Sequence, residues 1–142
     1  QAELAPAPAA APETTEEARV PDAFERATAA MRANRTQEAL EILSQEIAQV
    51  RSGRLRFQRK VQLAQICMAS GHEAIADPIL EEIGREIDQK NLEDWEAPDF
   101  LAHPLVLLLR CMSKLNRSPE ERQKTYARIC RLDPLQALSC SQ

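Results

Sequence analysis

The sequence predicts an all-α domain of about six helices, arranged in three antiparallel hairpins with tetratricopeptide-like stacking. Three observations predict this fold class. Apolar residues recur at three- and four-residue spacing between residues 22 and 131. Turn-forming residues separate these periodic stretches. No segment alternates with a period of two over a useful length, so we expect no strands.

Length and composition agree with a single helical domain. The chain has 142 residues, of which 44% are hydrophobic and 4% aromatic. This length suits one domain and excludes a multi-domain enzyme. The apolar content excludes a fully disordered chain. We divide the chain into a linker at 1–21, a helical domain at 22–138 and a tail at 139–142.

The N-terminal segment is expected to be a Pro/Ala-rich disordered linker. Four of the nine prolines fall in the first twelve residues, interleaved with alanine. Proline fixes its own φ and favours extended geometry in the residue before it, so the segment would act as a semi-rigid tether. Such a tether, together with a first residue that is Gln rather than Met, leads us to interpret the sequence as a fragment of a longer protein with another domain upstream. The alternative is a simple disordered tail.

Each predicted helix has a start or stop signal. Asp22 caps the first helix and Thr36 caps the second. Gly71 ends the third, and Ser118 caps the sixth. The expected helices cover about 22–33, 36–50, 55–69, 73–90, 98–115 and 118–131.

The hairpins resemble tetratricopeptide units without forming a regular array. Ala39 and Leu43 in the first hairpin correspond to Ala76 and Leu80 in the second. Their interval is 37 residues, whereas a tetratricopeptide unit has about 34. The third hairpin does not align cleanly, so we expect similar stacking of irregular units.

Six residues are predicted to be structural anchors. Trp95 is expected to be half-buried at the turn into the fifth helix, because its ring is large and its N–H needs a partner. Pro134 ends the last helix, since the residue before a proline avoids helical angles. The full set is Phe57, Leu63, Cys67, Trp95, Tyr126 and Pro134.

Charge is segregated along the chain, which has a net charge of −4. Residues 51–60 carry five positive and no negative side chains, whereas residues 73–99 carry ten acidic and two basic ones. An acidic chain with one aromatic residue in its basic segment does not indicate nucleic-acid binding. The basic segment is either the solvated face of a helix or a partner for the acidic stretch, within one subunit or across to a neighbour. The candidate interface residues are Arg51, Arg54, Arg56, Arg59 and Lys60.

The fifth helix contains an apolar run, 105–109, that must be covered on every side. Either a second subunit covers one side, or the helix is wrapped by its own chain. On the first alternative, Leu105, Leu108 and Leu109 are subunit-interface candidates. Pro104 is expected to kink or restart this helix.

The sequence offers no catalytic, cofactor or metal site. The four cysteines are at least ten residues apart, too far for a zinc knuckle. Three of them lie in apolar helical stretches, which predicts buried free thiols and a reducing, cytoplasmic location. The two histidines lack nucleophile or metal partners at a recognisable spacing. No apolar run approaches the roughly 20 residues that span a bilayer, so we expect no direct membrane insertion.

Two stretches resemble the C-terminal domain of the TssA family, the VasJ-type, ImpA-related proteins of the bacterial type VI secretion system. They are 53–99 and 126–138, and the opening hairpin at 23–43 is similar as well. The most specific pieces are RFxxxxxLAxxC at 56–67, LEDWE at 92–96 and CRLDP at 130–134. His103-Pro104 departs from the family, whose members usually keep a continuous helix there.

The resemblance implies a non-enzymatic domain that self-associates into a ring or star-shaped homo-oligomer. Such oligomers engage the tail, sheath or baseplate proteins of the contractile apparatus during assembly. The matched residues are packing residues, so no catalytic site carries over. The alternative function is a monomeric tetratricopeptide-like adaptor that binds a peptide in a concave groove. An enzyme is a third option, which would need a paired base and nucleophile.

Overall fold

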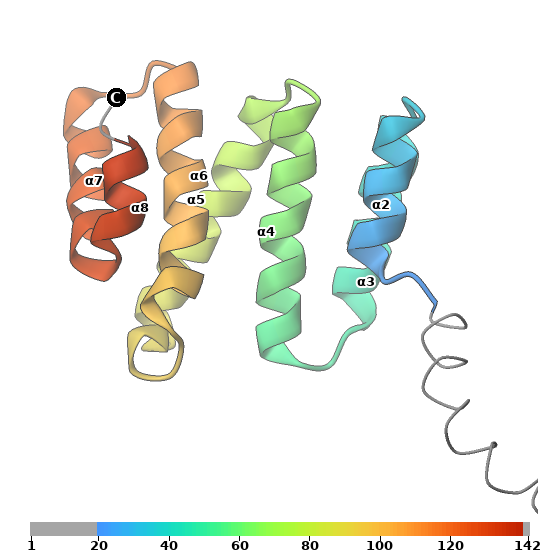
Figure 1. Ribbon diagram of the computed structural model, residues 1–142, viewed down its shortest axis with the longest axis horizontal. Coiled ribbons are helices and arrows are strands. Elements are labelled where there is room, and N and C mark those ends of the chain that lie inside the picture. The colour runs from blue at the N-terminus through green and yellow to red at the C-terminus, as the bar shows by residue number, and fades with distance from the viewer. Residues whose placement is uncertain (1–19, 141–142) are drawn as a thin grey trace, which may run out of the picture.

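The computed structural model describes residues 20–140 (Figure 1). The predicted linker lies outside the described residues except for Val20 and Pro21, so its disorder stays a prediction. In the described part there are seven α-helices, one short 3-10 helix and no strand, which confirms the all-helical class. The α-helices are α2 (Ala23–Arg32), α3 (Thr36–Gln49), α4 (Gly53–Ala69), α5 (Glu73–Gln89), α6 (Pro98–Lys114), α7 (Pro119–Leu132) and α8 (Pro134–Cys140), and the 3-10 helix is η2 (Leu92–Asp94).

The helix count differs from the prediction because Pro134 both ends α7 and begins α8. A proline is favoured at the first helical position, where its missing N–H would have no intrahelical partner. The side chain of Asp133 accepts a hydrogen bond from the backbone N–H of Leu135 at 3.1 Å, which supports the start of the new helix. The residues that we assigned to a tail from 139 onward therefore include the end of α8, at Cys140.

Local side-chain contacts explain most of the helix ends. Asp22 and Glu25 form a reciprocal capping box at the start of α2, with both hydrogen bonds at 2.8 Å. Ser118 caps α7 as predicted, through Glu121 N–H at 3.2 Å. Thr36, by contrast, is the first residue of α3, so its predicted capping role is wrong. Four of the connections turn on a residue with positive φ, namely Asn34, Gly71, Asn91 and Asn116.

The helices form two layers (Figure 1). Each α-helix packs against the next one in the chain, with η2 lying between α5 and α6. In addition α2 contacts α4, α4 contacts α6, and α6 contacts α8, whereas the backbones of α3, α5 and α7 do not touch one another. One layer therefore consists of α2, α4, α6 and α8, and the other of α3, α5 and α7.

The core consists of two clusters of unequal size. The smaller joins α2 and α3 to Ile66 of α4, and its other buried members are Ala23, Ala27, Ala30, Ala39 and Leu43. The larger extends from α4 to α8 and contains most of the buried leucine and isoleucine. Within the described residues, no helix is both long and apolar enough to cross a membrane.

Two glycines provide a matched test of this architecture. Gly84 lies inside α5, where an added Cβ would meet Leu105 Cδ2 at 3.8 Å, an ordinary contact. Gly84→Ala is expected to raise the free energy of unfolding by about 0.5–1 kcal/mol, because alanine is the better helix former. Gly71 has φ of +80°, so Gly71→Ala is expected to lower it by about 1 kcal/mol.

Urea unfolding followed by circular dichroism at 222 nm would measure both changes. Equal effects of the two substitutions would contradict the assignment of Gly84 to a helix interior and of Gly71 to a left-handed turn.

Candidate functional site

The basic segment lies in the first half of α4 and the turn before it, and most of its charged groups are used within the chain. Arg54 Nε is 3.0 Å from both carboxylate oxygens of Glu96, and its guanidinium lies 4.2 Å above the ring of Phe100. Lys60 Nζ is 3.9 Å from Glu86 Oε1. Both acidic partners belong to the 73–99 stretch. The predicted pairing of the two segments therefore exists inside one subunit.

Arg59 is the buried member of this segment, at 7% exposure. Its Nε donates to Glu46 Oε2 at 3.3 Å, and its Nη1 donates to Gln62 Oε1 at 2.8 Å. A third contact, 3.9 Å long, joins it to Asp22 at the start of α2. Arg59 thus ties α4 to both helices of the smaller cluster. Its prediction as a surface residue of a subunit interface is wrong, because its charge is neutralised inside the domain.

The remaining two residues of the segment differ from each other. Arg56 Nη2 donates to the carbonyl oxygen of Val50 at 2.8 Å and closes the connection between α3 and α4. Arg51 is exposed, and among the described residues it has no ion pair. Arg51 therefore keeps its charge available to another molecule.

The apolar run of α6 is covered by its own chain. Leu105 is 2% exposed and Leu108 4%. The reason is that α4, α5, η2, α7 and α8 all contact α6, so these leucines face other elements, whereas His103 and Arg110 of the same helix stay exposed. Leu105 and Leu108 are therefore core residues, and their prediction as interface residues is wrong. Leu109 is half-buried and lines a groove.

Pro104 does not restart this helix. It is buried inside α6, which is assigned without interruption from Pro98 to Lys114. His103 beside it is exposed, and partial burial together with the nearby positive charge of Arg110 lowers the pKa of its imidazole. An uninterrupted helix at this position is also what we expected of the family.

Trp95 is 81% exposed, so the prediction of a half-buried anchor is wrong. Asn91 takes a left-handed conformation, and the 3-10 turn that follows places Leu92 against the core instead. The anchoring aromatic is Phe100, whose ring stacks on Phe57 with a centroid distance of 5.4 Å. Trp95 remains on the surface between Asp94, which is exposed, and Glu96, which turns back to Arg54.

The other predicted anchors fall into three groups. Phe57 and Cys67 are buried in the larger cluster. Leu63 and Tyr126 are half-buried, the first against the smaller cluster and the second in a groove wall. Pro134 is exposed at the start of α8.

Two of the cysteines are buried free thiols, as predicted. Burial raises the pKa of the Cys67 thiol. Burial and nearby negative charge raise that of Cys111 to about 11. Cys130, the third cysteine that we expected to be buried, is free but only half-buried, so its predicted burial is wrong. Cys140 is also free and half-buried. No group of three or more potential metal ligands occurs among residues 20–140.

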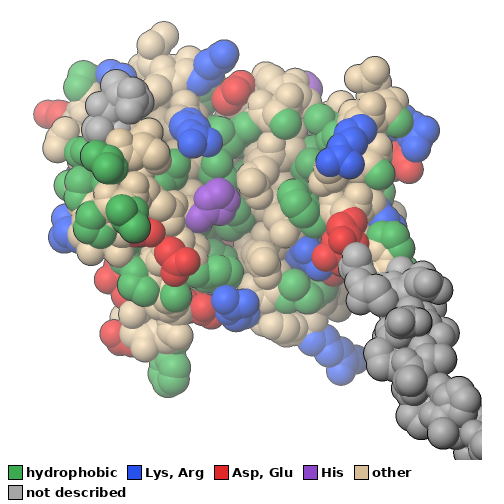
Figure 2. Space-filling view, in the orientation of Figure 1, with side chains coloured by type: hydrophobic (Ala, Val, Ile, Leu, Met, Phe, Trp, Pro, Cys, Tyr) green, Lys and Arg blue, Asp and Glu red, His purple; other side chains and the backbone are tan. Residues whose placement is uncertain are grey.

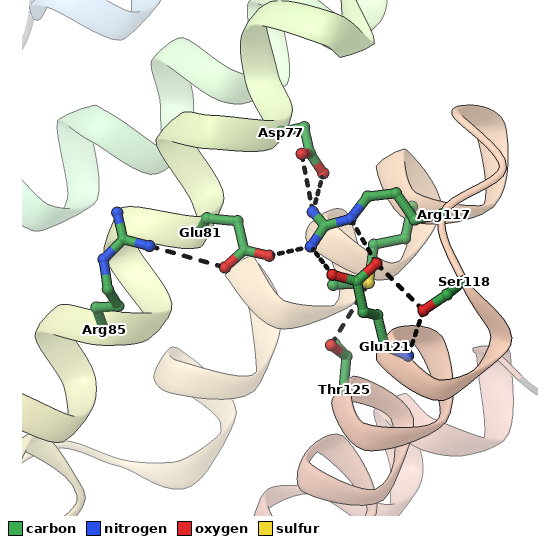
Figure 3. A network of polar contacts seen from close by, with 8 residues as sticks. Asp77, Glu81, Arg85, Arg117, Ser118, Glu121 and Thr125 are labelled. Carbon is green, nitrogen blue, oxygen red and sulfur yellow. Dashed lines mark hydrogen bonds and ion pairs between the residues drawn. The ribbon is translucent and has the colours of Figure 1, made fainter.

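Sequence reasoning missed an ionic network centred on Arg117 (Figure 3). Arg117 follows α6, and its Nη1 lies 2.8 Å from both carboxylate oxygens of Asp77 on α5. Its Nη2 binds Glu81 on α5 and Glu121 on α7, the latter at 2.9 Å. Hydrogen bonding to these carboxylates raises the pKa of Arg117, and the hydrogen bond from Arg117 lowers the pKa of Glu121.

A second arginine also joins α7 to α5. Arg128 Nη2 is 2.6 Å from Asp88 Oδ1, and its Nη1 approaches the carbonyl oxygen of Gly84 at 3.5 Å. Beneath these ion pairs a cavity of about 400 Å³ separates α5 from α7, and Leu105, Leu108 and Met112 form its apolar lining. The two arginines therefore bridge helices whose backbones do not touch.

A larger groove, of about 880 Å³, lies among α6, α7 and α8. Its apolar lining includes Leu109, Tyr126 and Cys140, and its basic lining consists of Arg110, Lys114 and Arg122. Hydrophobic side chains gather near the α8 edge of the molecule (Figure 2), where Leu135 is 79% and Leu138 68% exposed. The molecule thus presents a basic groove and, close to it, an exposed apolar patch.

The fold and its surfaces therefore define an all-helical protein over residues 20–140, with a basic groove and an exposed apolar patch near one end. A comparison with protein families matches residues 2–105 to the family described as "Type VI secretion, EvfE, EvfF, ImpA, BimE, VC_A0119, VasJ". This match covers more than half of the chain, so the chain belongs to that family of type VI secretion proteins, as the resemblance indicated. No curated protein and no solved structure matches it.

The Arg117 network gives a prediction for stability. Arg117→Ala is expected to lower the free energy of unfolding by about 1–2 kcal/mol at pH 7, because it leaves half-buried carboxylates without their cation. Arg85→Ala is the matched control. Its 3.9 Å contact to Glu81 is solvent-exposed, and we expect a loss of at most about 0.5 kcal/mol.

The difference in the free energy of unfolding between wild type and Arg117→Ala is expected to depend on pH. A carboxyl group with a lowered pKa in the folded state stabilises the protein above its ordinary pKa, and this contribution is lost as pH falls through the lowered value. The difference between wild type and Arg117→Ala should therefore shrink between about pH 5 and pH 3. Chemical denaturation at several pH values would measure it, and a difference that grew toward low pH would contradict the network.

Proposed function

We propose that this chain is the oligomerisation and docking domain of a TssA-like type VI secretion component. Its copies would form a ring that engages the contractile tail or baseplate during assembly. The family membership supports the type VI secretion part of this proposal. The oligomerisation part rests on exposed apolar side chains, above all Leu135 at 79% and Trp95 at 81% exposure.

Exposed large apolar residues are a signal for association. Contiguous apolar surface is uncommon on monomeric proteins and marks contact sites. From the sequence we assigned the subunit contact to the leucines of α6, but the domain itself buries Leu105 and Leu108. We propose the exposed patch on α8 as the contact surface instead. Trp95 lies on a different connection, so the two positions offer separate contact points. A symmetric ring would repeat both, and repetition turns weak individual contacts into strong overall attachment.

The helix arrangement supports a scaffold role. We propose that the helix pairs stack in a tetratricopeptide-like manner over 22–138, so that each pair buries its apolar face against the next. Cytoplasmic residence fits the buried free thiols Cys67 and Cys111, which a reducing compartment preserves. Enzymatic activity has no supporting observation, and we propose a purely structural role.

A monomeric peptide-binding adaptor is the second candidate. The groove of about 880 Å³ among α6, α7 and α8 favours it, because a peptide needs a concave surface. The two candidate functions predict different molecular masses in solution. The adaptor would remain a monomer at the concentration at which it binds, whereas the ring component would not.

Light scattering coupled to size-exclusion chromatography at micromolar concentration tests the proposal. Wild type is expected to be oligomeric, and Leu135→Ser to weaken self-association by about 10–100-fold, since an apolar side chain buried in a contact contributes roughly 1.5–3 kcal/mol. Trp95→Ser should also weaken it. Ile75→Ser on α5, which removes another exposed apolar side chain, is the control and should leave the mass unchanged.

A wild-type chain that stays monomeric at these concentrations would rule out the ring. Circular dichroism of each variant would exclude loss of folding as the cause of any change in mass.

A further inference from the structure

The groove among α6, α7 and α8 has the composition of a site for carboxylates. Arg110 and Lys114 come from α6 and Arg122 comes from α7, while none of the residues that line the groove is acidic. Among the described residues, none of these three cations has an ion pair. The opposite side of α7 differs, because Arg128 and the neighbouring Arg117 are matched there by acidic residues of α5.

Arg122 carries the most specific observation. Its Nε is the one side-chain nitrogen or oxygen in the described part of the chain that is buried without a hydrogen-bond partner. A buried polar group without a partner costs free energy, and the cost is larger for a charged group. A carboxylate is the acceptor that best fits a guanidinium, because its two oxygens match the planar N–H groups. The lining of the groove therefore has the donors and the positive charge that suit a carboxylate.

The chain itself contains a segment of the required chemistry. Residues 1–19 hold four glutamates and one arginine, and three of the glutamates, Glu13, Glu16 and Glu17, lie within five residues. Three carboxylates thus correspond to three unpaired cations. The two threonines between them, Thr14 and Thr15, add hydroxyl groups that can hydrogen-bond to serine or tyrosine side chains in the groove.

The chain between this segment and α2 is too short for the three glutamates to reach the groove of their own copy. The segment joins α2 at Val20, and α2 lies at the opposite end of the molecule from α7 and α8 (Figure 1). An extended residue spans at most about 3.6 Å, so Glu17 reaches no more than about 11 Å from Val20. Going from α2 through α4 to α6 crosses two helix spacings of about 8–10 Å each. Glu17, and with it the complete set of three glutamates, falls short of the groove in its own chain.

We infer that Glu13–Glu17 of one copy binds in the α6–α7–α8 groove of a second copy, with its carboxylates paired to Arg110, Lys114 and Arg122. This inference rests on the proposed self-association and assigns one contact of it. The contact is heterologous, since two different surfaces meet, and repeating such a contact produces a ring when the rotation closes. Electrostatic pairing of this kind selects the partner surface and its register.

Cys140 provides a built-in reporter, because it lines the groove. One chain carries Glu16→Cys and Cys140→Ser, and a second, tagged chain keeps Cys140. After mixing and exposure to a short thiol cross-linker, we expect a cross-linked species with the mass of one untagged plus one tagged chain. Arg110→Glu with Arg122→Glu in the tagged chain should reduce its yield at least tenfold. Cys140→Ser in the tagged chain should abolish it and exclude Cys130 as the reacting thiol.

Charge exchange provides the second arm. Glu13→Arg, Glu16→Arg and Glu17→Arg together should weaken self-association by at least tenfold, more strongly at low than at high salt. Combining them with Arg110→Glu, Lys114→Glu and Arg122→Glu should restore it. Glu3→Arg, in the same segment but outside the set of three, is the matched control and should have little effect.

The outcomes separate the inference from the proposed function. An oligomer that forms normally but gives no Cys140 cross-link, or that ignores the charge exchange, would overturn the inference and leave self-association standing. A wild-type protein that is monomeric at every concentration tested would overturn both the inference and the proposed function.

Discussion

The burial of the apolar residues of α6 is the constraint on which the rest of the structure depends. Its apolar run leaves no side that can face water, so neighbouring helices must surround it. The two layers provide this enclosure, with α4 and α8 beside it in its own layer and α5 and α7 behind it. The larger core cluster follows from this arrangement, because most of its members face α6 or pack on residues that do. Arg117 and Arg128 then bridge α5 and α7 above the cavity that separates these two helices.

Much of the fold was predictable because amphipathic spacing is a local property. Helix boundaries such as Asp22, Gly71 and Ser118 depend on residues within one turn, and the structure has each of them at a helix end. The seventh α-helix was missed because it is one short segment begun by the same proline that ends α7. Trp95 was misplaced because the general tendency of tryptophan toward burial says nothing about which residue of a tight turn faces inward.

The interaction surfaces were less predictable, since sequence contains chemistry but no distances. The complementarity of the 51–60 and 73–99 segments was correctly identified, yet nothing in the sequence could tell an intramolecular pair from an intermolecular one. The requirement that the apolar run of α6 be covered was right, and of the two alternatives left open, it is the chain itself that covers Leu105 and Leu108. The Arg117 network had a local signal in the spacing of Arg117 and Glu121. Its partner Asp77, forty residues away, had none.

The unequal division of the core has a consequence for the first two helices. Their cluster is built mostly from alanines, with Leu43 and Ile66 as its large buried side chains and five half-buried apolar side chains packed around them. It therefore has fewer fully buried large side chains than the cluster that extends from α4 to α8. Arg59 forms ion pairs with Glu46 and Asp22, and these hold the first two helices to α4. We therefore expect the α2–α3 pair to detach at a lower free energy cost than the cooperative unfolding of α4 to α8. Each such detachment would add the length of two helices to the chain between α4 and the glutamates at 13–17.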